Sequence, residues 1–309
     1  MDIDVLRVSG KAEWKRLDEL TRTRNLSGED IDELDRLYRS ATTDLARVRT
    51  SSPDPDLIAD LSRTLSAARG RLAGTGGLTG AAIARFFRVS LPLTLYQIRW
   101  GTLAVAAIFV VLGAIQAHYL MTTPDAMNEL GTPEQLRNYA HTSFVEYYHQ
   151  DTNAEFGLSV WANNAWIALV GVGTGITGAY PLKILWDNAT SIGTSTAIVF
   201  THGGVWHFFR FILPHGLPEL TAVFISIAAG LRVFWSLLVP GPMTRFQAVG
   251  QAARGAMTVA VGCAILLAGS GVLEGFVTPS DLPDAVKITL GALMTAAVWA
   301  YILILGRRV

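Results

Sequence analysis

The chain has 309 residues, of which 50% are hydrophobic and only 16% are charged, and its mean hydropathy is +0.35. This composition excludes an ordinary soluble domain and indicates a membrane protein. The 25 basic and 25 acidic residues cancel, which gives no reason to expect a nucleic-acid partner, and the single cysteine excludes an intramolecular disulfide.

Charge is concentrated in the first part of the chain. Residues 1–99 contain 16 of the 25 basic residues and 14 of the 25 acidic ones. Apolar residues recur there every three or four positions, and Ser27 followed by Glu29 and Asp30 is typical of a helix start. The pattern predicts that residues 1–80 form a soluble cytoplasmic domain of three short antiparallel helices.

A short segment, residues 81–99, mixes arginines with aromatic and apolar residues. This mixture suits a helix that lies at the level of the lipid headgroups. We therefore expect an interfacial amphipathic pre-helix before the first membrane span.

Six apolar stretches in residues 100–309 approach the length of about 20 residues that a bilayer requires. The stretches are Trp100–Met121, Leu158–Tyr180, Ala189–Ile212, Glu219–Val239, Ala256–Phe276 and Val286–Leu305. The third contains His202, His207 and Arg210, so a broken or re-entrant element is the alternative there. The predicted fold is an all-α polytopic helix bundle of about six spans with an N-terminal soluble helical domain.

The basic residues also predict an orientation. The arginine-rich N-terminal part, Lys183, Arg245 and the last arginines fall on one side of six spans, which is the pattern of cytoplasmic loops. We expect a multi-pass protein of the bacterial inner membrane with both termini in the cytoplasm. The extracytoplasmic loop at 122–157 contains a segment that starts at Pro133 and resembles an amphipathic helix capping the bundle, with His141 and His149 in solvent.

Polar residues gather at the predicted outer ends of three spans. Glu219 starts span four with His215 just before it, Glu274 ends span five, and Asn163 and Asn164 lie in the first turns of span two. If the segment is helical, His215 and Glu219 lie on one face, because they are four residues apart. We therefore predict a polar intramembrane cluster of these five residues.

Two prolines accompany the histidine of this cluster. Pro214 and Gly216 suggest a tight turn that leads into span four, and Pro218 suits the first turn of a helix, where its missing N–H costs little.

Three interpretations of the cluster remain open. It is a hydrogen-bonded lock between spans that needs no cofactor, or His215, Glu219 and Glu274 form a proton-handling site or hold a divalent metal such as zinc, or the residues are independent and solvated.

Two further features lie inside apolar stretches. Arg232 is predicted to be a buried charge, which must face the bundle or a wet cavity, or extend toward the cytoplasm. Gly171 and Gly175 form a face of small residues that suits close helix packing, within the chain or in a homodimer.

The residues of the cluster belong to a set of short motifs that resembles the stage II sporulation protein M family. The motifs are Asn163-Asn164, Pro214-His215-Gly216 with Glu219-Leu220, Ala228-Ala229-Gly230-Leu231, and Glu274-Gly275-Phe276-Val277-Thr278-Pro279, within roughly residues 95–305. The resemblance implies a polytopic inner-membrane protein. In spore-formers the family member is a membrane scaffold that holds two peptidoglycan-remodelling proteins, and members also occur in bacteria that make no spores.

These observations predict a non-enzymatic scaffold that anchors envelope or peptidoglycan-remodelling proteins among membrane lipids, with a homodimer as a further partner. Two other classes are alternatives. An intramembrane metal-dependent hydrolase would use His215, Glu219 and Glu274 to activate water. A transporter or permease would need a polar cavity near mid-membrane, formed by Arg232, His202 and His207.

Overall fold

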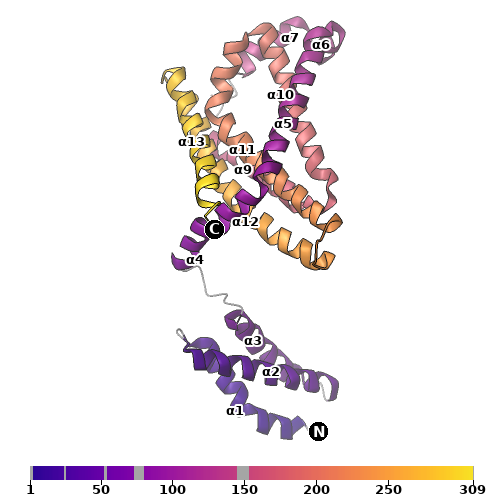
Figure 1. Cartoon of the computed structure of the whole chain (residues 1–309), viewed down its shortest axis with the longest axis vertical. Helices are drawn as coiled ribbons and strands as arrows, with labels where there is room; N and C mark the ends of the chain where they lie inside the picture. The colour runs from indigo at the N-terminus through magenta and orange to yellow at the C-terminus, as the bar shows by residue number, and fades with distance from the viewer. Residues whose placement is uncertain (1–2, 24–25, 52–53, 73–79, 145–152, 309) are drawn as a thin grey trace. The chain divides into compact units, whose positions relative to one another are not determined.

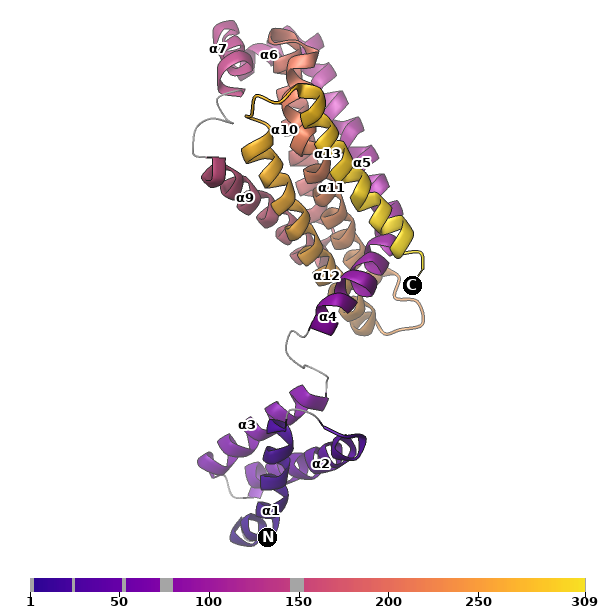
Figure 2. The same ribbon diagram turned by 90° about the vertical axis from the view of Figure 1, so that its left-hand side faces the viewer.

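The computed structural model describes residues 3–23, 26–51, 54–72, 80–144 and 153–308. It divides the chain into two compact units, Met1–Ile83 and Ala84–Val309. Every regular element among the described residues is a helix (Figures 1 and 2), which confirms the all-α prediction.

The first unit is a bundle of three helices, each of which contacts the other two. These helices are α1 (Ile3–Arg22), α2 (Gly28–Ser51) and α3 (Pro55–Leu72). The predicted start of α2 is confirmed, because the Ser27 N–H donates to the Asp30 carboxylate over 2.9 Å and the Asp30 N–H donates to the Ser27 hydroxyl over 3.1 Å. The backbone bond and the bond from the Ser27 hydroxyl hold the pKa of Asp30 below its usual range.

The described residues of the second unit form six long helices and several short ones. The long helices are α5 (Leu91–Thr122), α9 (Asn153–Gly173), α10 (Ala179–His202), α11 (Val205–Leu238), α12 (Arg245–Val272) and α13 (Asp284–Leu305). The central helix is α11, because it contacts each of the other five.

The residues before the first span do not form a separate helix. The short helix α4 (Gly80–Arg85) and a π-helical turn, η1 (Phe86–Ser90), lead directly into α5, so one continuous helix runs from Gly80 to Thr122. Leu91, Leu95 and Ile98 are buried in the core of the bundle. The pre-helix expected at 81–99 therefore continues into the first span, because its second half packs against other helices.

Within the described part of the chain, five helices are long and apolar enough to cross a membrane. They correspond to predicted spans one, two, four, five and six, and α10 is not among them. Lys183, Asp187 and a run of serines and threonines lower the hydropathy of α10. The described residues thus contain five candidate spans, and predicted span three falls on the more polar helix α10 and the start of α11.

The more polar helix α10 nevertheless follows α5 along most of its apolar length. Leu185 and Val105 belong to one hydrophobic cluster near one end, and Val199 and Leu120 belong to another near the other end. At a rise of 1.5 Å per residue, this shared stretch of α5 is about 22 Å long. Thus α10 lies beside a candidate span over that distance.

The turn between predicted spans three and four was placed wrongly. The chain turns at Gly203 and Gly204, where Gly204 has a φ of +91° that favours glycine, and α11 then runs through both Pro214 and Pro218. Proline removes a backbone hydrogen bond, but neighbouring helices compensate for this in membrane proteins. Here Gly291 of α13 packs directly on the carbonyl of Pro214, which the ring of Pro218 leaves without a helical donor.

Glycines allow α9 and α11 to approach each other closely. A Cβ atom built on Gly230 would lie 2.2 Å from the backbone oxygen of Gly171, and one built on Gly175 would lie 2.7 Å from the backbone of Gly230. The packing role predicted for Gly171 and Gly175 is confirmed. This face is occupied within the chain, so a homodimer would have to use another one.

The segment after α5 folds back over one end of the bundle. We call residues 124–144 the cap segment; it contains α6 (Pro124–Leu130), α7 (Pro133–Asn138) and a π-helical turn, η2 (Tyr139–Ser143). Its buried Met127, Leu136 and Phe144 pack against α5, α10 and α11. This confirms the predicted capping helix up to residue 144, whereas His149 lies outside the described residues.

We predict that Gly230→Ala destabilises the bundle by about 1–3 kcal/mol, because the new methyl group would collide with the rigid backbone of Gly171. Thermal unfolding in detergent measures the change. Gly173→Ala is the matched control, since a Cβ there would meet no atom within 4 Å. Equal melting temperatures for the two variants would contradict the close contact.

Candidate functional site

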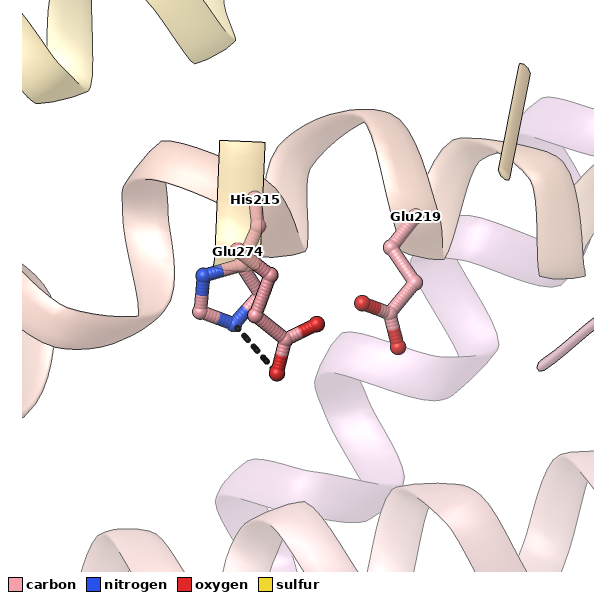
Figure 3. A group of neighbouring side chains, drawn as sticks. All are labelled: His215, Glu219 and Glu274. Atoms are coloured by element: carbon pink, nitrogen blue, oxygen red, sulfur yellow. Dashed lines mark ion pairs between the residues drawn. The ribbon is translucent and has the colours of Figure 1, made fainter. Parts of the chain in front are cut away.

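The structure brings His215, Glu219 and Glu274 together (Figure 3). One ligand-type atom from each of them can be chosen so that all three lie within 4.8 Å of one another. His215 Nε2 is 3.8 Å from Glu274 Oε1, and both side chains are almost fully buried, with Glu219 partly buried. The convergence expected from the sequence is therefore present for these three residues.

Two members of the cluster lie further from a helix end than predicted, whereas Glu274 lies at the end of α12 as expected. His215 and Glu219 lie near the middle of α11 rather than before and at its start. They share one helical face, as their spacing predicts, and Figure 3 shows both side chains directed toward Glu274.

A π-helical turn at the end of α12 positions the third member. This turn, η5 (Leu273–Val277), contains Glu274, and the Thr278 N–H donates to the Leu273 carbonyl over 2.8 Å. A π-helical turn re-aims the side chains around it and is frequent at functional sites. Here it places the Glu274 carboxylate and the Thr278 hydroxyl on either side of the His215 ring.

The hydrogen bonds of Thr278 fix the state of the His215 ring. The Thr278 hydroxyl donates to the Leu273 carbonyl over 3.1 Å, so it must accept a hydrogen bond from His215 Nδ1, which is 3.2 Å away. His215 is thus the Nδ1–H tautomer, and its Nε2 lone pair faces Glu274. The Ser270 hydroxyl donates to the backbone oxygen of His215 over 2.9 Å and further attaches α12 to α11 at this level.

The carboxyl groups of Glu219 and Glu274 have few hydrogen-bond partners among the described residues. The side-chain amide of Asn164 is within hydrogen-bonding reach of Glu219. Glu274 Oε2 is buried and has no hydrogen-bond partner among the described residues. The buried Lys287 ammonium donates to the Thr278 carbonyl over 2.8 Å and forms no ion pair with either glutamate. An unmatched buried carboxylate oxygen is costly, so this arrangement calls for a proton or a cation between the groups.

The two asparagines of the predicted cluster lie on different sides of α9. Asn164 is buried near the middle of α9, whereas Asn163 is exposed on the other side of that helix. Only Asn164 belongs to the cluster, because consecutive residues of a helix point about 100° apart.

Arg232, the charge expected near mid-membrane, lies near the end of a helix. Arg232 is exposed near the end of α11 and donates to the Gln97 side chain over 3.0 Å, beside a groove of about 360 Å³. His207 is near the other end of the same helix, about 37 Å away at 1.5 Å per residue. Arg232 and the two histidines therefore form no common cavity, and the site expected for a transporter is not formed by these residues.

The histidines near the cap segment have structural contacts. His141 Nε2 donates to the His202 carbonyl over 2.8 Å, and His207 Nε2 donates to the Ala140 carbonyl over 3.1 Å. An Arg210 N–H donates to His207 Nδ1 over 3.2 Å. These bonds attach the cap segment to α10 and α11.

Sequence reasoning missed Thr278 and Ser270 as members of the site. The available signal was their spacing, because Ser270, Glu274 and Thr278 recur at intervals of four along one stretch of the chain. That spacing places three polar side chains toward one neighbour in an otherwise apolar segment.

Apolar helices around a buried polar cluster define a polytopic α-helical membrane protein. The family model described as Stage II sporulation protein M matches residues 102–279, which is more than half of the chain. The chain therefore belongs to the stage II sporulation protein M family, as the sequence motifs predicted. A domain of unknown function, DUF8413, matches residues 6–74, and no curated protein or solved structure matches the chain.

We predict that Thr278→Val lowers the free energy of unfolding by about 1–3 kcal/mol, because it leaves the buried His215 Nδ1–H without an acceptor. Thermal or denaturant unfolding in detergent measures the loss. Thr289→Val is the control, since Thr289 is exposed on α13 and bonds only within its own helix. If both variants lose equally little stability, the tautomer assignment is wrong.

Proposed function

We propose that this protein is a non-enzymatic scaffold of the bacterial inner membrane that anchors envelope or peptidoglycan-remodelling proteins. The observation that supports this most is the cap segment, which is held on the bundle by its apolar face and presents a different face outward. Asp125, Glu129 and Glu134 are exposed on it, and Leu130 is 45% exposed.

That outward face has the features of a docking surface. An exposed leucine surrounded by carboxylates suits a partner with an apolar patch and basic residues around it. The cap is fixed by buried Met127, Leu136 and Phe144 and by the capping box of Thr132 with Gln135. A partner would therefore bind a surface that is already ordered.

The N-terminal unit has features that suit the binding of a second protein partner. It has its own hydrophobic core and matches a separate family model. Its surface carries many ion pairs, including Arg16 with Glu33 at 2.8 Å and Arg7 with Asp54 at 2.8 Å. A charged, independently packed domain next to a membrane unit suits a cytoplasmic protein partner.

The proposed membrane placement has support in the aromatic residues of α11. Trp206 and Trp235 are 59% and 61% exposed near the two ends of this helix. They are about 43 Å apart at 1.5 Å per residue, close to the 40–45 Å of a bilayer with its headgroup regions. Tryptophan favours both interfaces, so α11 has the length and the anchors of a complete span.

A photo-crosslinking amino acid at Leu130, introduced in cells that express the full chain, tests the scaffold proposal. We expect a crosslink to an envelope protein of the peptidoglycan-remodelling class, weakened when Glu129 and Glu134 are both changed to Lys. Trp166, 64% exposed on α9, is the lipid-facing control. Equal crosslinking at both positions, or remodelling proteins whose location is unchanged when the protein is deleted, would contradict the proposal.

Cysteine labelling of intact cells tests the proposed orientation. An impermeant maleimide should modify Asp125→Cys and spare Lys15→Cys, because the charge pattern places the cap segment outside and the first unit in the cytoplasm. Both positions are exposed, and the native Cys263 is buried, so the background is low. Labelling of Lys15→Cys but not of Asp125→Cys would show that the orientation is the reverse of the one proposed.

A further inference from the structure

The three side chains that meet between α11 and the end of α12 have the composition of a metal site. One imidazole nitrogen and two carboxylates face a common space, with ligand atoms within 4.8 Å of one another (Figure 3). We propose that His215, Glu219 and Glu274 bind one divalent transition-metal ion of the zinc class, which links the two helices. The proposal goes beyond the scaffold function and does not depend on it.

The distances favour an ion over direct contacts. His215 Nε2 and Glu274 Oε1 are 3.8 Å apart, which is too long for a hydrogen bond. Two ligands bound to one zinc ion at about 2.1 Å lie roughly 3.4 Å apart at the tetrahedral angle and up to about 4.2 Å apart at wider angles. Closing the largest separation of 4.8 Å requires the side chains to move by less than about 1 Å.

The histidine is already prepared as a ligand. Thr278 accepts a hydrogen bond from Nδ1, so Nε2 carries the lone pair, and it lies 3.8 Å from Glu274 Oε1. Metal-binding histidines usually donate their other N–H to an oxygen acceptor, which fixes the tautomer and the ring orientation. Asn164 supports Glu219 in the same way, as an outer partner of a ligand.

Charge balance favours a divalent cation. Two ionised carboxylates beside a neutral imidazole carry two negative charges in a bundle interior, and one divalent ion neutralises them. Lys287 is bonded to the Thr278 carbonyl. The buried Glu274 Oε2 has no partner among the described residues, and it faces the shared space.

The ligand set indicates the kind of ion. Magnesium and calcium prefer oxygen ligands alone, whereas imidazole suits zinc and its first-row neighbours. Ligands from the middle of α11 and from the end of α12 would make the ion a cross-link between two helices, and no reaction is needed to explain the site.

Metal analysis of the purified full-length chain tests the proposal directly. The protein is prepared in lipid nanodiscs with an affinity tag that contains no histidine, and its metal content is measured by mass spectrometry. We expect about one zinc-class ion per chain. A chain that stays metal-free and binds no added Zn²⁺ or Co²⁺ at micromolar concentrations would overturn the proposal and would favour a cluster neutralised by protons.

Substitutions assign the ligands. His215→Gln, Glu219→Gln and Glu274→Gln should each lose the ion, whereas His118→Gln and Glu134→Gln, at exposed positions, should keep it. Thr278→Val should weaken binding by roughly 10–100-fold, because it removes the group that orients the ring. Metal retained in all three ligand variants would place the ion elsewhere and overturn the assignment.

If the ligand variants do not fold, X-ray absorption spectroscopy of the wild-type protein still tests which atoms bind the metal. The spectrum should show one imidazole nitrogen with the other ligands oxygen. Ligation by sulfur, or by several imidazoles, would contradict the site.

Discussion

A polar group inside an apolar helix bundle needs a hydrogen-bond or charge partner. This requirement determines how α11 packs against the end of α12. His215 and Glu274 are almost fully buried, and each comes from a different helix. The Thr278 hydroxyl contacts the ring of His215 and the Ser270 hydroxyl donates to its backbone oxygen, so a short stretch from the last turn of α12 to Thr278 holds a single residue of α11. Separating the two helices would remove the contact of the His215 ring with Thr278 and the bond from Ser270, in a medium that offers few other partners.

The same region of α11 depends on backbone that is unusual for a helix. Pro218 leaves the Pro214 carbonyl without a helical donor, and Gly291 of α13 packs against that carbonyl. Glu219, the residue after Pro218, has the side-chain amide of Asn164 of α9 within hydrogen-bonding reach. The middle of α11 is thus where α9, α12 and α13 all make contact with it.

The sequence predicted the helical class, the cap helix, the glycine packing and the convergence of His215, Glu219, Glu274 and Asn164, because helical spacing and apolar length are local properties. It could not place the turn before α11, since Pro214 and Pro218 break helices in water and are tolerated in a membrane bundle. It also could not separate Asn163 from Asn164, because the rotation of α9 is set by packing. The spacing of Thr278 from Ser270 and Glu274 indicates a shared face, but its contact with the His215 ring depends on a π-helical turn that the spacing does not predict.

An experimental density map of the full-length protein in nanodiscs tests the central claim most directly, since it shows how α11 and the end of α12 are joined. The account predicts continuous density from His215, Glu219 and Glu274 to one strong central feature, with Thr278 beside the far nitrogen of the ring. Side chains that point toward lipid, or that lie too far apart to share any ion or proton, would contradict it.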